Sequence, residues 1–202
     1  MVQWIYQEMK KYIAEFVWTF VLTLVVIFGV AGKLPIITPV AAGIAVVIAV
    51  YFFGAISGTN INPAVTIGLL TDRKIGFAQA AGYIVGQFLG AGLALALARY
   101  LIDFQSTLVV INSGRVFVAE ALGTFFLVFA ITMIIHHHDG WTVSGGLIGL
   151  SLVIGAIIAG SVSNGMLNPA VAFAAGSFSW VYILGPISGS IVGVHTAKFF
   201  FK

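Results

Sequence analysis

The tetrapeptide Asn62-Pro63-Ala64-Val65 occurs a second time as Asn168-Pro169-Ala170-Val171. Asn is a strong helix N-cap because its side-chain oxygen accepts a hydrogen bond from a free N–H of the first turn. Proline suits the next position, where its missing N–H costs nothing. Each copy therefore predicts a helix start that carries a partial positive charge and an amide that can still donate. One copy would indicate only a turn and a helix, whereas two facing copies predict a site that attracts a lone-pair oxygen and repels cations.

The composition indicates an integral membrane protein. The chain has 202 residues, of which 60% are hydrophobic and 7% charged, against about 25% charged residues in soluble domains. Six spans of about 20 residues fit this length, so we expect a single membrane domain over residues 1–202. The absence of cysteine excludes thiol catalysis and cysteine metal sites. The net charge of +3 does not point to nucleic acid, and we expect no cofactor and no metal.

Six apolar stretches predict transmembrane helices at Tyr12–Gly32, Ile36–Ile56, Gly76–Leu101, Val116–Ile135, Thr142–Gly160 and Ser179–Phe200. Polar runs at Ser57–Ile61 and Ser161–Leu167 lead into the two tetrapeptides. The helices expected after them, Pro63–Leu70 and Pro169–Ala175, are too short to span a membrane. The first is about 12 Å long at 1.5 Å per residue, under half of a hydrocarbon core of ~30 Å.

The second half of the sequence repeats the first. Glu15 and Glu120, each following an alanine, are 105 positions apart, and Asn62 and Asn168 are 106 apart. This constant register predicts a duplication, with repeats at roughly 10–101 and 115–202. Three spans per repeat is an odd number, so the second repeat must be inverted. The two short helices then enter from opposite faces, and irregular backbone at that depth must be buried in protein or line water.

Two further patterns bear on packing and orientation. Matched glycine triplets predict close helix contacts, and they comprise Gly82, Gly86, Gly90, Gly185, Gly189 and Gly193.

Basic residues concentrate on the side of the termini, with Lys10, Lys11, Arg73, Lys74, Lys198 and Lys202 there and Lys33, Arg99 and Arg115 opposite. This asymmetry predicts that both termini are cytoplasmic, in a protein of the cell membrane.

The chain resembles the aquaporin and aquaglyceroporin family, the major intrinsic proteins, over essentially all its length. The resemblance rests on Ser57–Val65, Gly165–Ala170, Trp180–Pro186 and the two Ala-Glu pairs. It implies an all-α membrane fold, an inverted repeat of six transmembrane helices plus two re-entrant half-helices. It also implies a homotetramer, surrounded by membrane lipid, with one pore in each subunit.

The resemblance assigns roles to particular residues. It implies that Asn62 and Asn168 of the two NPA motifs donate to the passing oxygen, and that Glu15 and Glu120 brace the re-entrant loops. The residues themselves favour the same role for the two acids, because an ionisable group inside a span needs a partner. The free N–H groups of the loops are the nearest candidates.

The sequence departs from the family at the outer constriction, the selectivity filter. By the family's spacing, its four positions fall on Ala42, Ala156, Gly165 and Val171. Most members carry an arginine where Val171 stands and an aromatic residue at the first position. All four residues here are small or apolar, so we expect a wide and uncharged filter.

These features predict passive conduction of water and small uncharged solutes such as glycerol-like molecules. An ion-conducting or gated channel on the same scaffold is the alternative, motivated by Val171. A secondary transporter is disfavoured because Glu15 and Glu120, if they brace the loops, leave no ionisable pair for coupling to protons or sodium. An enzyme is disfavoured because the sequence shows no nucleophile–base constellation. A structural membrane protein has no specific feature in its favour. His136-His137-His138-Asp139 could bind a metal or sense pH, but we interpret it as a polar turn.

Overall fold

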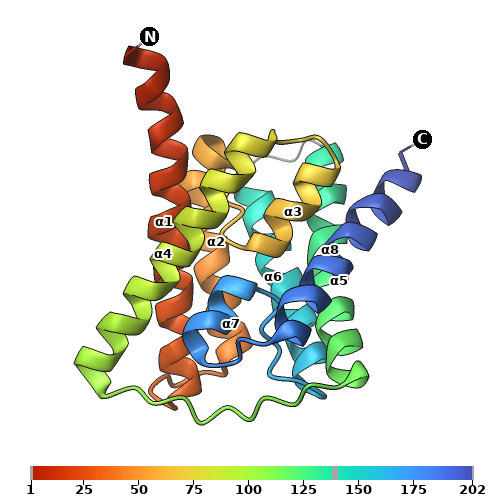
Figure 1. Ribbon diagram of the computed structural model, residues 1–202. Coiled ribbons are helices and arrows are strands. Elements are labelled where there is room, and N and C mark those ends of the chain that lie inside the picture. Colours follow the sequence, from red (N-terminus) through yellow and green to blue (C-terminus); the bar gives the residue numbers. More distant parts are fainter. Residues whose placement is uncertain (1, 138–140, 202) are drawn as a thin grey trace.

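The computed structural model describes residues 2–137 and 141–201, and these residues form an all-helical bundle (Figure 1). Six of its helices are long and two are short. In chain order the helices are α1 (Val2–Val30), α2 (Thr38–Ser57), α3 (Pro63–Thr71), α4 (Phe77–Ile102), α5 (Gly114–His137), α6 (Trp141–Gly160), α7 (Pro169–Ala175) and α8 (Trp180–Phe199).

The helices follow the predicted spans, with differences at some ends. Helix α1 begins at Val2 because the polar N-terminal segment continues the helix beyond the apolar span. Helix α5 runs through His137, so the prediction that His136 and His137 lie in a turn is wrong. These two histidines occupy the last helical turn, where a helix terminus favours basic side chains. The rest of that predicted turn, residues 138–140, lies outside the described residues.

Five of the described helices, α1, α2, α4, α5 and α6, are long and apolar enough to cross a membrane. Helix α8 has 20 residues, but Gly185, Pro186 and His195 lower its hydropathy. It packs along α5 and against the short helix α3. The sequence predicts it as the sixth span from its position in the second repeat.

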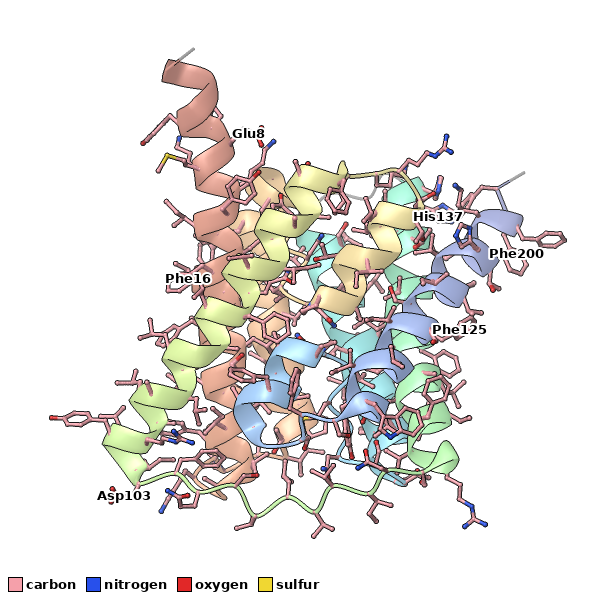
Figure 2. The ribbon with its side chains drawn as sticks, viewed as in Figure 1. Glu8, Phe16, Asp103, Phe125, His137 and Phe200 are labelled. Carbon is pink, nitrogen blue, oxygen red and sulfur yellow. The ribbon has the colours of Figure 1, made fainter. Side chains whose placement is uncertain are left out.

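The two halves of the chain pack in the same way. Helix α1 contacts α2 and α4, just as α5 contacts α6 and α8. Each short helix also packs on a long helix of the other half, α3 on α8 and α7 on α4. The two short helices approach from opposite ends of the bundle, and both termini lie at the same end (Figure 1). Asp103, which follows α4, lies at the end opposite Glu8 and Phe200 (Figure 2).

The glycine triplets lie where helix backbones approach most closely. A Cβ atom added to Gly185 or Gly193 would come within 2.9 Å of Phe117 O or 2.8 Å of Phe125 O, respectively. A Cβ on Gly189 would overlap the carbonyl oxygen of Ala121. Gly86 and Gly90 meet α1 backbone in the same manner. The predicted tight packing of helices is therefore confirmed. The α8 glycines let α8 pack closely against the backbone of α5.

We expect Gly189→Ala to lower the midpoint of thermal unfolding in detergent by several degrees, because overpacking costs about 1–3 kcal/mol. The matched control is Gly92→Ala in α4, where an added Cβ meets nothing within 4 Å. This control should keep or raise the midpoint, since alanine favours a helix over glycine by about 1 kcal/mol. Circular dichroism during heating measures both, and equal midpoints would contradict the packing argument.

Candidate functional site

Both short helices begin at the asparagine that the sequence predicts as their cap. Asn62 is extended, and its Oδ1 accepts a hydrogen bond from Ala64 N at 2.8 Å. Asn168 Oδ1 accepts from Ala170 N at 3.0 Å and from Val171 N at 3.3 Å. A proline occupies the first helical position in both cases. The cap fixes χ1 and χ2 of each asparagine, so the direction of its amide nitrogen is fixed as well.

The two asparagines tie the re-entrant loops to each other. Asn62 Nδ2 donates to Leu167 O at 2.9 Å, and Asn168 Nδ2 donates to Ile61 O at 2.9 Å. Each acceptor is the residue just before the other asparagine, so the two side chains lie side by side. These bonds use one N–H of each amide, and a second N–H remains. Both asparagines line a cavity, toward which that second hydrogen can donate.

Two fully buried glutamates hold the loop backbones. Glu15 accepts from Asn60 N at 2.9 Å, Ile61 N at 2.6 Å and Ser57 Oγ at 2.8 Å. Glu120 accepts from three corresponding donors of the second loop, namely Met166 N at 3.0 Å, Leu167 N at 2.7 Å and Ser163 Oγ at 2.7 Å. Both side chains have no exposed surface. The N–H groups left without partners by the irregular backbone thus meet carboxylates.

Several supporting residues were not assigned a role from the sequence. Gln87 donates to Glu15 Oε2 at 2.8 Å and to Thr66 Oγ1 at 2.9 Å. Tyr83 donates to Ser57 O at 2.7 Å, and Tyr182 accepts from Asn164 N at 3.1 Å. The serines beside the glutamates, Ser57 and Ser163, obey the 106-residue offset of the asparagines and could have been found by it. The tyrosines lie off that register and carry no such signal.

Non-glycine residues in the loops adopt the left-handed backbone region. Thr59 has φ +52°, Ile61 φ +44° and Leu167 φ +53°, and Gly165 matches Thr59 with φ +62°. A non-glycine residue costs about 1–3 kcal/mol there, and such strain concentrates at functional sites. This conformation lets Ile61 and Leu167 give their N–H to a glutamate and their C=O to the opposite asparagine.

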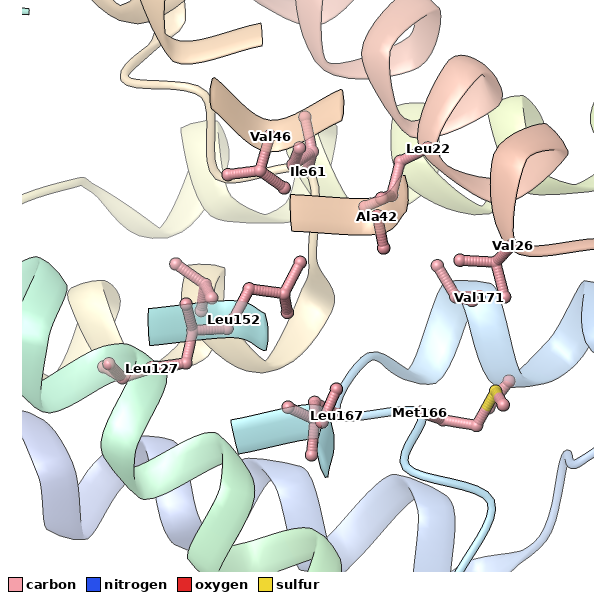
Figure 3. Close-up of a cluster of buried hydrophobic side chains, with 14 of the residues drawn as sticks. Leu22, Val26, Ala42, Val46, Ile61, Leu127, Leu152, Met166, Leu167 and Val171 are labelled. Carbon is pink, nitrogen blue, oxygen red and sulfur yellow. The ribbon is translucent and has the colours of Figure 1, made fainter. Parts of the chain in front are cut away.

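The four predicted filter positions come together around one cavity of about 330 Å³, which we call the outer cavity. Ala42 comes from α2, Ala156 from α6, Val171 from α7 and Gly165 from the second loop. Ala42 and Val171 belong to one hydrophobic cluster (Figure 3), together with residues of α1 such as Leu22 and Val26. Among the described residues that line this cavity, none carries a charge.

A second cavity, of about 520 Å³, adjoins the first and is called the inner cavity. The two cavities share five lining residues, which are Thr59, Asn60, Val65, Ile131 and Ile148. Ser57, Gln79 and Lys74 contribute polar groups to the inner cavity, and Lys74 is the charged side chain among its described lining residues. Both cavities therefore adjoin the first re-entrant loop, which contributes Thr59 and Asn60 to each.

Comparison with known proteins agrees with this geometry. The sequence profile of the major intrinsic proteins matches residues 3–196. The chain belongs to the major intrinsic protein family. It is 36% identical to glycerol uptake facilitator protein-like 6 of Lactiplantibacillus plantarum over 94% of this chain and 97% of that protein. It is 33% identical to aquaporin NIP1-1 of Zea mays over 75% of this chain and 58% of that protein.

A solved structure shows the same fold. The aquaglyceroporin from Plasmodium falciparum superimposes with a TM-score of 0.77 at 18% identity, covering 96% of each chain. As a major intrinsic protein, the chain is a multi-pass membrane channel for water and small solutes. It is not an enzyme, as the sequence predicts. Its fold is the predicted all-α inverted repeat with two re-entrant half-helices.

The three described histidines of this major intrinsic protein, His136, His137 and His195, do not line either cavity. The His136 ring stacks on Phe201 with centroids 4.3 Å apart, and His137 meets the same ring edge-on at 5.5 Å. His195 is exposed on the outside of α8. The described residues contain no group of three potential metal ligands. His138 and Asp139 lie outside the described residues.

We expect Glu15→Gln to lower both stability and water permeability, because an amide nitrogen would face the loop N–H groups that now meet a carboxylate oxygen. Each buried group left unsatisfied costs about 1–3 kcal/mol. The matched control is Glu8→Gln on the same helix, since Glu8 pairs with Lys11 at the partly exposed N-terminal end. Thermal unfolding in detergent and proteoliposome shrinkage measure the two effects. A Glu15→Gln channel that behaves like the Glu8→Gln control would contradict the bracing role.

Proposed function

We propose that this channel conducts water and neutral solutes of glycerol size or larger through a wide, uncharged outer filter. The observation that supports the proposal is the lining of the outer cavity. Its four filter positions hold two alanines, one glycine and one valine, and its described lining contains no charged side chain. An arginine at Val171 would both narrow and charge this space, and the small apolar residue leaves it open.

The distribution of polar groups favours solutes with an apolar side and a polar side. The amides of Asn62 and Asn168 and the loop residues Asn164 and Thr59 lie on the side of the re-entrant loops. Side chains such as Leu22, Val46 and Leu152 make the remaining wall apolar. A polyol can turn its hydroxyl groups toward the amides and its carbon chain toward this wall. The name of the relative from Lactiplantibacillus plantarum, glycerol uptake facilitator protein-like 6, agrees with such a solute.

Exclusion of cations is assigned to the middle of the channel in this proposal. The N-termini of α3 and α7 meet beside the paired asparagine amides, so partial positive charge and N–H donors converge there. We infer that this barrier acts without help from a filter arginine. Measurable ion conduction would therefore favour the alternative function, an ion-conducting or gated channel, over a channel for neutral solutes.

We also propose the assembly and placement that the sequence predicts. They are a homotetramer in the cell membrane, with both termini cytoplasmic and repeats near residues 10–101 and 115–202. Large apolar side chains exposed on the long helices support contact with lipid or with neighbouring subunits. Tyr51, Phe52, Leu89 and Leu150 are each more than half exposed.

The test of the proposed function is stopped-flow light scattering of proteoliposomes. An excess of sucrose outside the vesicles gives water permeability from the rate of shrinkage, and gradients of glycerol and urea give solute permeability. We expect water and at least one of the solutes to cross faster than in empty liposomes. Rates equal to those of empty liposomes for all of them would reject the proposal. Planar-bilayer recordings in potassium chloride test the alternative, for which sustained single-channel currents are expected.

We expect Val171→Arg to reduce glycerol permeability several-fold while changing water permeability less. The guanidinium would fill part of the outer cavity and add a charge that repels cations. The matched control is Val171→Met, which lengthens the side chain without adding a charge. If size alone governs glycerol flux, both variants reduce it, whereas only Val171→Arg should lower any cation leak. Unchanged glycerol permeability in both variants would contradict a filter at this position.

A further inference from the structure

The longest connection between helices, residues 103–113, crosses the end of the bundle that contains α7 (Figure 1). Its first part is anchored by Phe104, whose side chain is 4% exposed within a hydrophobic cluster that includes Ala170 and Ala174 of α7. Ser106 Oγ then donates to Ala175 O at 2.6 Å. An added Cβ on Gly176, which has φ +90°, would overlap Ser106. The connection is thus fitted against the C-terminal end of α7.

A second anchor joins the connection to the loop that carries the filter residue Gly165. Asn164 Nδ2 donates to Val109 O at 3.2 Å and to Ser177 Oγ at 2.9 Å. Leu108 N donates to Ser106 Oγ at 3.3 Å. Residues on both sides of Leu108 are therefore held by hydrogen bonds, and its backbone position is set relative to Gly165.

These anchors direct alternate side chains inward and outward. Leu108 lines the outer cavity and packs against the hydrophobic cluster that contains Ala42 and Val171. Val109 points away and is 72% exposed. An isobutyl side chain consequently projects into a cavity whose four filter positions carry nothing larger than valine.

We propose that Leu108 is a solute-selecting residue, a loop-borne side chain that limits the size of molecules entering the outer cavity. The inference rests on the proposed function and adds a residue to it. With small residues at Ala42, Ala156 and Gly165, the width of the entrance depends on larger side chains from elsewhere. Leu108 is placed to supply one because its connection is bonded both to α7 and to the second re-entrant loop.

The first test measures permeability to glycerol, erythritol and xylitol in proteoliposomes. We expect Leu108→Ala to raise the ratio of xylitol to glycerol permeability at least threefold, and Leu108→Trp to lower glycerol permeability several-fold. The matched controls are Val109→Ala and Val109→Trp, which change the neighbouring outward side chain and should leave the ratio unchanged. Leu108 variants with the same ratios as their Val109 controls would overturn the proposal.

The second test does not depend on transport. The chain contains no cysteine, so L108C and V109C each introduce a unique thiol. In detergent, we expect a small methanethiosulfonate to label both variants, and a 5-kDa polyethylene-glycol maleimide to label L108C at least tenfold more slowly than V109C. Small-reagent labelling should also block glycerol flux through L108C and spare V109C.

The two tests separate the possible failures. Equal labelling of the two thiols by the large maleimide would overturn the placement of Leu108, whatever the channel transports. A wild-type protein that passes no neutral solute would overturn the proposed function, and the selecting role would fall with it. Slow labelling of L108C together with a size-dependent change in polyol ratios supports both.

Discussion

The whole arrangement depends on satisfying irregular backbone inside a membrane, where no water is available to bond it. Glu15 and Glu120 do this for the N–H groups of the two re-entrant loops, with Ser57 and Ser163 adding a hydroxyl to each carboxylate. A buried carboxylate is costly unless several donors surround it. The loops supply those donors, so each loop and its glutamate stabilise the other.

The backbone conformation of the two re-entrant loops also directs their carbonyl groups toward the asparagines of the opposite half. Ile61 and Leu167 take left-handed conformations that β-branched and aliphatic residues otherwise avoid. In this conformation, Ile61 O accepts a hydrogen bond from Asn168 Nδ2, and Leu167 O accepts one from Asn62 Nδ2. The reciprocal bonds hold the two half-helices end to end. Strain in the loops is thus offset by hydrogen bonds that exist only when both halves are in place.

The chemistry of this channel differs from one end to the other. Its middle is rich in fixed amide donors, while the outer cavity is bounded by Ala42, Ala156, Gly165 and Val171 and lacks charge among its described lining residues. In the proposed function, discrimination at the outer end rests on size and on apolar contact. The anchored connection that carries Leu108 makes the shape of this entrance depend on a segment outside the helical bundle.

The helix caps, the two short helices and the inverted repeat could be predicted from the sequence alone. These are local or periodic features, fixed by N-cap chemistry at Asn62 and Asn168 and by the 106-residue register. The three-dimensional packing was needed to show which donors meet Glu15, that Gln87 supports it, and that Leu108 lines the outer cavity. Such contacts join residues distant in sequence, and their geometry follows from packing, which no local pattern encodes. The end of α5 was mispredicted for a related reason, because polar histidines continue a helix when Phe201 packs against them.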